Sequence, residues 1–135
     1  MLNTFPELLN YSILAPTLIR FVLGFVLITV GLEILKPSKR YLFSAYFSSR
    51  AYPLADLLPW KFGIAQIIVG LFLIFGFFTQ IASLIAMYTI FWLLYIENRQ
   101  EKILPHTSAF YLVMFVMALS LLLTGAGAFA VDLPL

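Results

Sequence analysis

Apolar residues in this chain gather in long blocks that short polar clusters separate. The blocks cover about residues 16–35, 61–78, 81–96 and 107–124, and each approaches the roughly 20 apolar residues that a helix needs to cross a bilayer. Thr79 and Gln80 alone separate the second block from the third, but one helix over both would be about 54 Å long, far beyond one bilayer. The pattern therefore predicts an all-α, integral membrane four-helix bundle, a single transmembrane domain over residues 1–135.

The segment between the first two spans is rich in aromatic residues. Residues 41–60 hold three tyrosines, two phenylalanines and one tryptophan, together with Arg50, Asp56 and two prolines. Because amphipathic aromatic side chains favour the membrane–water interface, we expect an interfacial or re-entrant aromatic segment here. A packed loop and a lid over a ligand site both fit this composition, since long loops are often functional.

Lysine and arginine are distributed unevenly between the two ends of the predicted bundle. One residue, Arg20, lies within a span, and the other seven lie in or beside the loops after the first and third spans: Lys36, Lys39, Arg40, Arg50, Lys61, Arg99 and Lys102. Short loops rich in Lys and Arg stay in the cytoplasm. We therefore expect loops 1 and 3 in the cytoplasm and both termini outside.

Arg20 is a charge inside the apolar run of the first span. Gly24 and Gly31 lie within about 40° of it on a helical wheel, so this stripe is expected to pack against other helices. Arg20 and Asp132, in the tail, both lie toward the side of the termini. Because a buried charge needs a hydrogen-bonded partner, we predict that Arg20 pairs with Asp132 or with carbonyls at the 125–127 break. Such a pair would either fasten the tail or hold an anionic or quinone carbonyl group.

The second span carries a similar stripe. Gly63, Gln66 and Gly70 fall within about 60° of one another. Small residues let membrane helices approach closely, and a glutamine can form a hydrogen bond across the interface. These three residues are therefore predicted helix-packing positions. The single histidine, His106, lies in a polar connection, where it could cap the fourth helix or titrate.

Composition supports the membrane assignment and argues against some other classes of protein. Hydrophobic residues make up 63% of the chain and charged residues 10%, against about 45–50% and 25% in soluble domains. A net charge of +2 without a basic stripe argues against nucleic-acid binding. The first eleven residues contain Glu7 and no Lys or Arg, so we expect no cleaved signal peptide.

The chain has no cysteine, which excludes disulfides, iron–sulfur clusters and thiolate metal sites within it. One histidine cannot supply both axial ligands of a haem. No metal-ligand cluster and no nucleophile–base pair appear, so catalytic residues are not expected. Redox chemistry would need an organic carrier such as a quinone, or a cofactor of a partner.

Three stretches together resemble the DoxX-like family of membrane proteins. They are RFVLGFVLITVGLEILK at 20–36, AQIIVGLFLIFGFFTQIASLIAM at 65–87 and GAGAFAVD at 125–132. The chain departs from the family pattern at Gln66, where relatives commonly have an acidic residue, and at Val30, where they often have histidine. The missing carboxylate argues against proton-coupled quinone chemistry at Gln66.

The resemblance implies a four-helix bundle in a prokaryotic plasma membrane. Some relatives are the small membrane subunit of a thiosulfate:quinone oxidoreductase. We therefore expect a non-catalytic accessory or scaffold subunit that assembles with another membrane protein or with itself. A quinone-binding subunit with its site at Arg20 and Asp132 is the alternative. A small-solute transporter is a third hypothesis, weakened because the spans lack the midspan breaks of such proteins.

Overall fold

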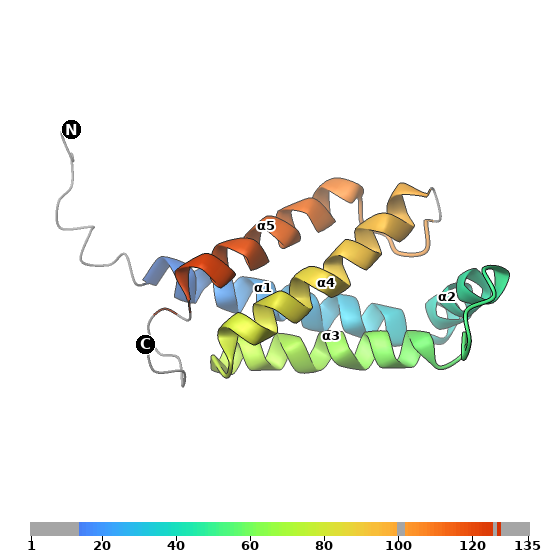
Figure 1. Cartoon of the computed structure of the whole chain (residues 1–135), viewed down its shortest axis with the longest axis horizontal. Coiled ribbons are helices and arrows are strands. Elements are labelled where there is room, and N and C mark those ends of the chain that lie inside the picture. Colours follow the sequence, from blue (N-terminus) through green and yellow to red (C-terminus); the bar gives the residue numbers. More distant parts are fainter. Residues whose placement is uncertain (1–13, 100–101, 126, 128–135) are drawn as a thin grey trace.

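The computed structural model describes residues 14–99, 102–125 and 127 (Figure 1). This part of the chain is helical and contains no strand. Its five helices are α1 (Leu14–Leu35), α2 (Pro37–Ser49), α3 (Leu58–Phe75), α4 (Thr79–Asn98) and α5 (Ser108–Thr124). By length and composition, α1, α3 and α4 can each cross a membrane, and α5 is a shorter apolar helix of 17 residues. The all-helical membrane class is thus confirmed, whereas a fourth crossing by α5 stays a prediction.

Local chemistry sets helix bounds that differ slightly from the expected spans. Helix α3 begins and ends three residues earlier, because Pro59 fits its first turn and Gly76 ends it in a left-handed conformation with φ 70°. The turn to α4 therefore comprises residues 76–78. Thr79 and Gln80, expected to form that turn, belong to the first turn of α4.

The aromatic segment after α1 contains a helix of its own. Helix α2 turns Phe43, Tyr46 and Phe47 inward, where they are buried. The hydroxyl of Ser44 donates a hydrogen bond to the carboxylate of Asp56, which ties α2 to the following loop. In Figure 1, α2 projects from the end of the bundle where α1 ends and α3 begins.

The other four helices pack side by side. Helix α1 lies along α3, α4 lies along α5, and contacts of α3 with α4 and of α1 with α5 close the bundle. The start of α1, the 76–78 turn and the end of α5 lie at one end, here called the terminus end (Figure 1). Helix α2 and the connection between α4 and α5 lie at the opposite, loop end.

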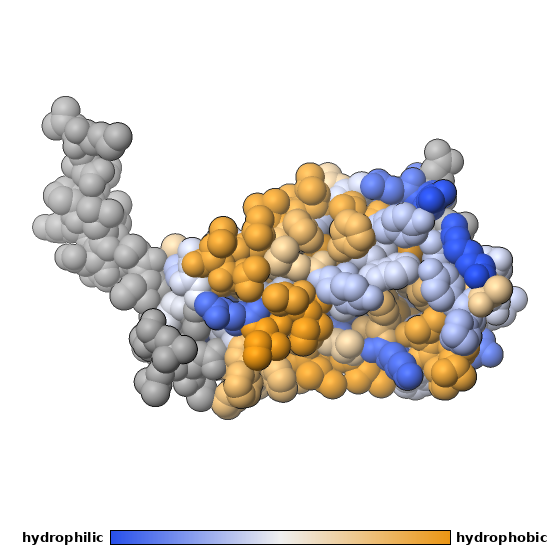
Figure 2. Space-filling view, in the orientation of Figure 1, coloured by the Kyte–Doolittle hydropathy of each residue, from blue (hydrophilic) through white to orange (hydrophobic). Residues whose placement is uncertain are grey.

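Large apolar side chains cover the outside of the helices between these ends. Examples from three helices are Leu18, Phe25, Leu84 and Leu123, all well over half exposed. Figure 2 shows this hydrophobic surface along the helices, with most hydrophilic side chains gathered at the loop end. Such a surface suits contact with lipid.

Candidate functional site

The seam between α1 and α3 is lined by glycines. Gly24 of α1 lies against Gly70 of α3, and Gly31 lies against Gly63. The two members of each helix are seven residues apart, so an antiparallel arrangement lets both pairs meet in one register. A Cβ atom at Gly24 would lie 2.7 Å from the carbonyl oxygen of Gly70, and one at Gly70 would lie 2.6 Å from that of Gly24. The two backbones are therefore in direct contact.

Gln66 lies between the two glycines of α3, close to the middle of that helix. Its side chain is fully buried, and neither amide atom forms a hydrogen bond with a described residue. A Cβ atom at Gly31 would lie 3.1 Å from the Cβ of Gln66, so the glutamine is held against α1. Leaving a buried amide unbonded costs about 1–3 kcal/mol. At this position an apolar side chain of similar size would therefore stabilise the bundle more than Gln66 does.

Arg20 is also fully buried, near the terminus end. Its guanidinium carbon lies 5.5 Å from the centre of the Phe21 ring. Asp132, its predicted partner, lies outside the described residues, so that pairing stays a prediction. A Cβ atom at Gly127 would lie 2.8 Å from the hydroxyl oxygen of Thr17, which places Gly127 against the first turn of α1.

The loop end contains a pair that the sequence patterns did not indicate. His106 Nε2 lies 3.0 Å from Glu33 Oε2, and each side chain is 26% exposed. The imidazole stacks on Phe110, with ring centres 4.4 Å apart and planes at 21°, and Tyr111 meets it edge-on. Glu33 comes from α1 and His106 from the connection before α5. The one available signal was that Glu33 is a carboxylate inside an apolar span.

A small cavity lies next to Tyr111 and has room for about one water molecule. It is lined by Phe43, Leu93, Ile96, Glu97, Ile103, Leu104 and Tyr111. The described residues contain no group of three or more His, Asp and Glu side chains placed to hold a metal ion. The polar centres are thus separate: Arg20 at one end, Gln66 in the middle and Glu33 with His106 at the other.

These features define a helical integral membrane protein with buried polar side chains on its first two long helices. The family model for DoxX matches residues 15–98, well over half of the chain, and the protein belongs to the DoxX family. The match extends from α1 to the end of α4 and includes the glycine seam, Arg20, Glu33 and Gln66, but not His106 or α5. No curated protein and no solved structure matches the chain.

Proposed function

We propose that this DoxX-family protein is a non-catalytic accessory or scaffold subunit of a membrane complex, with α1, α3, α4 and α5 crossing the bilayer. The observation that carries the proposal is the filled interior along α1. Leu23, Leu27, Val30 and Ile34 are each 0% exposed, and they occupy the length of α1 between Arg20 and the loop end. A continuous polar path for a solute has no place along this packed row, which argues against a transporter.

The glycine seam supports the same function. Backbone contact between α1 and α3 at the glycine pairs holds the two helices close together, so they behave as one stiff unit. A stiff unit with an apolar exterior presents a constant surface to a neighbouring subunit. The positive charge of the loop end favours its placement on the cytoplasmic side of a prokaryotic plasma membrane.

Photo-cross-linking in the native membrane tests this proposal. A photoreactive amino acid would replace one exposed apolar residue on each of α1, α3, α4 and α5, namely Leu18, Ile68, Leu84 and Val113. We expect protein adducts at one or two positions and lipid adducts at the others, because a partner covers only part of the surface. The buried position Leu27 is the control and should give no intermolecular adduct.

Mass spectrometry of the adducts distinguishes a second copy of the chain from a different subunit. Lipid adducts at all four exposed positions, together with a stable monomer after mild extraction, would exclude an assembly role. Both measurements use the full chain as folded in its own membrane, before or after mild extraction, so they do not depend on refolding.

A quinone-binding subunit is the second candidate, and the pair of Glu33 and His106 favours it. The imidazole N–H of His106 can donate a hydrogen bond to a quinone carbonyl while Glu33 orients the imidazole, and Phe110 offers a ring face for stacking. In membranes that reduce quinone, His106→Phe keeps an aromatic ring but removes the donor, so it should raise KM about tenfold, the value of one hydrogen bond of about 1.4 kcal/mol. Asn98→Ala at the same end is the control. An unchanged KM for His106→Phe would exclude this site, whereas a changed KM for Arg20→Ala would favour one at the terminus end.

A further inference from the structure

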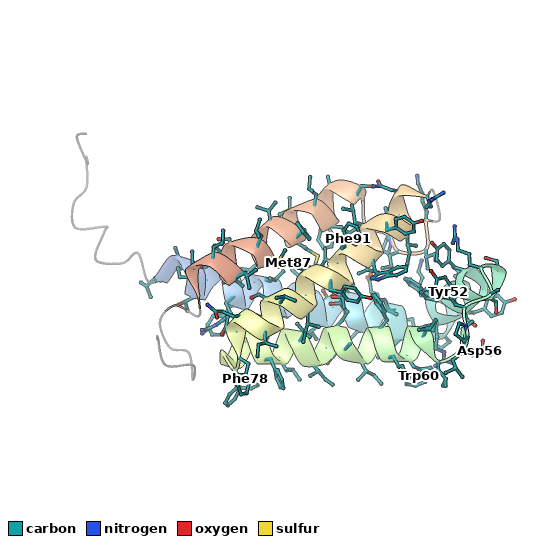
Figure 3. All side chains as sticks on the ribbon, viewed as in Figure 1. Tyr52, Asp56, Trp60, Phe78, Met87 and Phe91 are labelled. Atoms are coloured by element: carbon teal, nitrogen blue, oxygen red, sulfur yellow. The ribbon has the colours of Figure 1, made fainter. Side chains whose placement is uncertain are left out.

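Four basic side chains and one tryptophan gather where α1, α2 and α3 meet. We call them the basic corner: Lys36, Lys39, Arg40, Trp60 and Lys61. Lys36 precedes α2, two members lie in its first turn, and the other two lie in the first turn of α3. Figure 3 shows Trp60 at this end of the molecule, close to α2 and far from Phe78 at the terminus end.

Helix packing brings the two parts of the basic corner to the same level of the bundle. A Cβ atom at Gly63 would lie 2.7 Å from Cγ of Leu35, so the end of α1 touches the beginning of α3. Lys36 follows Leu35 directly, and Lys61 stands two residues before Gly63. Both lysines are exposed. The two positive charges therefore belong to one surface although they are far apart in sequence.

Arg40 is held in place without being neutralised. Its guanidinium carbon lies 4.8 Å from the centre of the Trp60 ring. A cation–π contact of this kind orients the guanidinium but leaves its positive charge and hydrogen-bond donors available. Trp60 is itself 44% exposed, so its indole reaches the surface beside the charges.

The nearby carboxylates are engaged elsewhere. Asp56 accepts a hydrogen bond from Ser44, and Glu33 contacts His106. Within the described part of the chain, no lysine or arginine of the basic corner forms an ion pair with a carboxylate. The corner therefore has an excess of positive charge that an external anion can compensate.

Exposed apolar and aromatic side chains border this charge. Tyr41 of α2 is 74% exposed, and Leu42 of α2 and Leu54 and Leu57 of the connection to α3 are also exposed. Basic groups beside tyrosine, tryptophan and leucine are typical of a surface at the boundary between headgroups and acyl chains. A soluble anion would bind the basic groups, but it would make no contact with these apolar side chains.

We propose that the basic corner binds the headgroup phosphates of anionic phospholipids, with Trp60 lying at the level of the glycerol backbone. Each lysine or arginine near an anionic leaflet strengthens such binding about fivefold. Several charges acting together enrich anionic lipid at the corner over zwitterionic lipid. The surrounding leucines enter the acyl boundary and fix the depth of α2.

Quenching of Trp60 by brominated lipid measures this enrichment. The chain has two tryptophans, so the full chain carrying Trp92→Phe reports on Trp60 alone. It would be reconstituted in vesicles of phosphatidylcholine and phosphatidylglycerol in which only one of the two lipids is brominated. We expect the quenching to correspond to a ratio of phosphatidylglycerol to phosphatidylcholine beside Trp60 that is at least fivefold above the ratio in the bulk bilayer. Equal quenching by the two lipids would overturn the proposal.

Two variants that each lose three positive charges distinguish a local lipid site from a general electrostatic attraction to this end of the bundle. Replacing Lys36, Lys39 and Lys61 by glutamine should reduce the enrichment to nearly none. The matched control replaces Arg50, Arg99 and Lys102 by glutamine at the same end of the bundle, and it should retain most of the enrichment. An equal loss in both variants would overturn the local site.

Two measurements with unaltered corner residues complete the test. Raised ionic strength should lower the enrichment, because screening weakens exposed charges, and an enrichment insensitive to salt contradicts the electrostatic argument. Millimolar inorganic phosphate at constant ionic strength should not displace the lipid. Displacement would identify the corner as a site for a free anion and overturn the lipid as its occupant.

Discussion

Alanine substitutions in the glycine seam should destabilise the protein to different extents, depending on which atoms the new methyl group contacts. At Gly70 the added Cβ would lie 2.6 Å from the carbonyl oxygen of Gly24, which is backbone and cannot turn away. At Gly63 the nearest atom is Cγ of Leu35, at 2.7 Å, which belongs to a flexible side chain, and the nearest backbone oxygen is 3.2 Å away. We therefore expect Gly70→Ala to destabilise the protein more than Gly63→Ala does, because the Leu35 side chain can rotate whereas the backbone cannot.

The size of the effect follows from these distances. To restore an ordinary contact of 3.4 Å at Gly70, the backbones of α1 and α3 must separate locally by about 0.8 Å. Overpacking of this kind costs about 1–3 kcal/mol. Alanine recovers about 1 kcal/mol through its higher helix propensity. The free energy of unfolding should fall by up to about 2 kcal/mol for Gly70→Ala and by less for Gly63→Ala.

Unfolding in mixed micelles with increasing dodecyl sulfate, followed by circular dichroism, measures the difference. The two variants carry the same chemical change in the same helix, so each is the control for the other. Gly24→Ala should behave like Gly70→Ala, because its Cβ also meets a backbone oxygen, at 2.7 Å. Equal stability of Gly63→Ala and Gly70→Ala would refute the explanation based on backbone contact.

Three further substitutions can be tested in the same titration. Gln66→Leu should raise the free energy of unfolding by about 1–3 kcal/mol, because it removes a buried amide that has no hydrogen bond with a described residue; lower stability would contradict this. Arg20→Ala should lower it by about 3–5 kcal/mol, because it empties the volume of a fully buried side chain, and an unchanged midpoint would show that the region collapses without strain. Glu33→Gln should change it by less than about 1 kcal/mol, because the pair with His106 is partly exposed; a larger loss would mean that this pair fastens the loop end.

The candidate sites differ in how far the sequence could predict them. A helical wheel places Gly24 and Gly31 on one face, but it does not say which helix meets that face. The pairing of Gly31 with Gly63 depends on the antiparallel register of α1 and α3, and the path of residues 36–57 sets that register. The contact between Glu33 and His106 joins residues more than seventy positions apart. No local pattern connects them, so sequence periodicity could not indicate the pair.

The secondary structure of α2 also could not be predicted from the sequence alone. Its residues have no long apolar run, and Pro53 follows them in the connection to α3. The sequence indicated an aromatic segment at the interface, whereas its helix depends on burying Phe43 and Phe47 against the bundle. The stability of this helix therefore comes from burial against the bundle and not from local helix propensity.

The sequence by itself determined the membrane class, the long helices and the end of the molecule that carries positive charge. These properties follow from the lengths of apolar runs and the positions of charges, and each acts locally along the chain. The tertiary structure decided which faces meet: glycine against glycine in the seam, a carboxylate beside an imidazole, and Arg40 over Trp60. Those contacts depend on distances between helices and on the register between them, which arise only when the whole bundle packs.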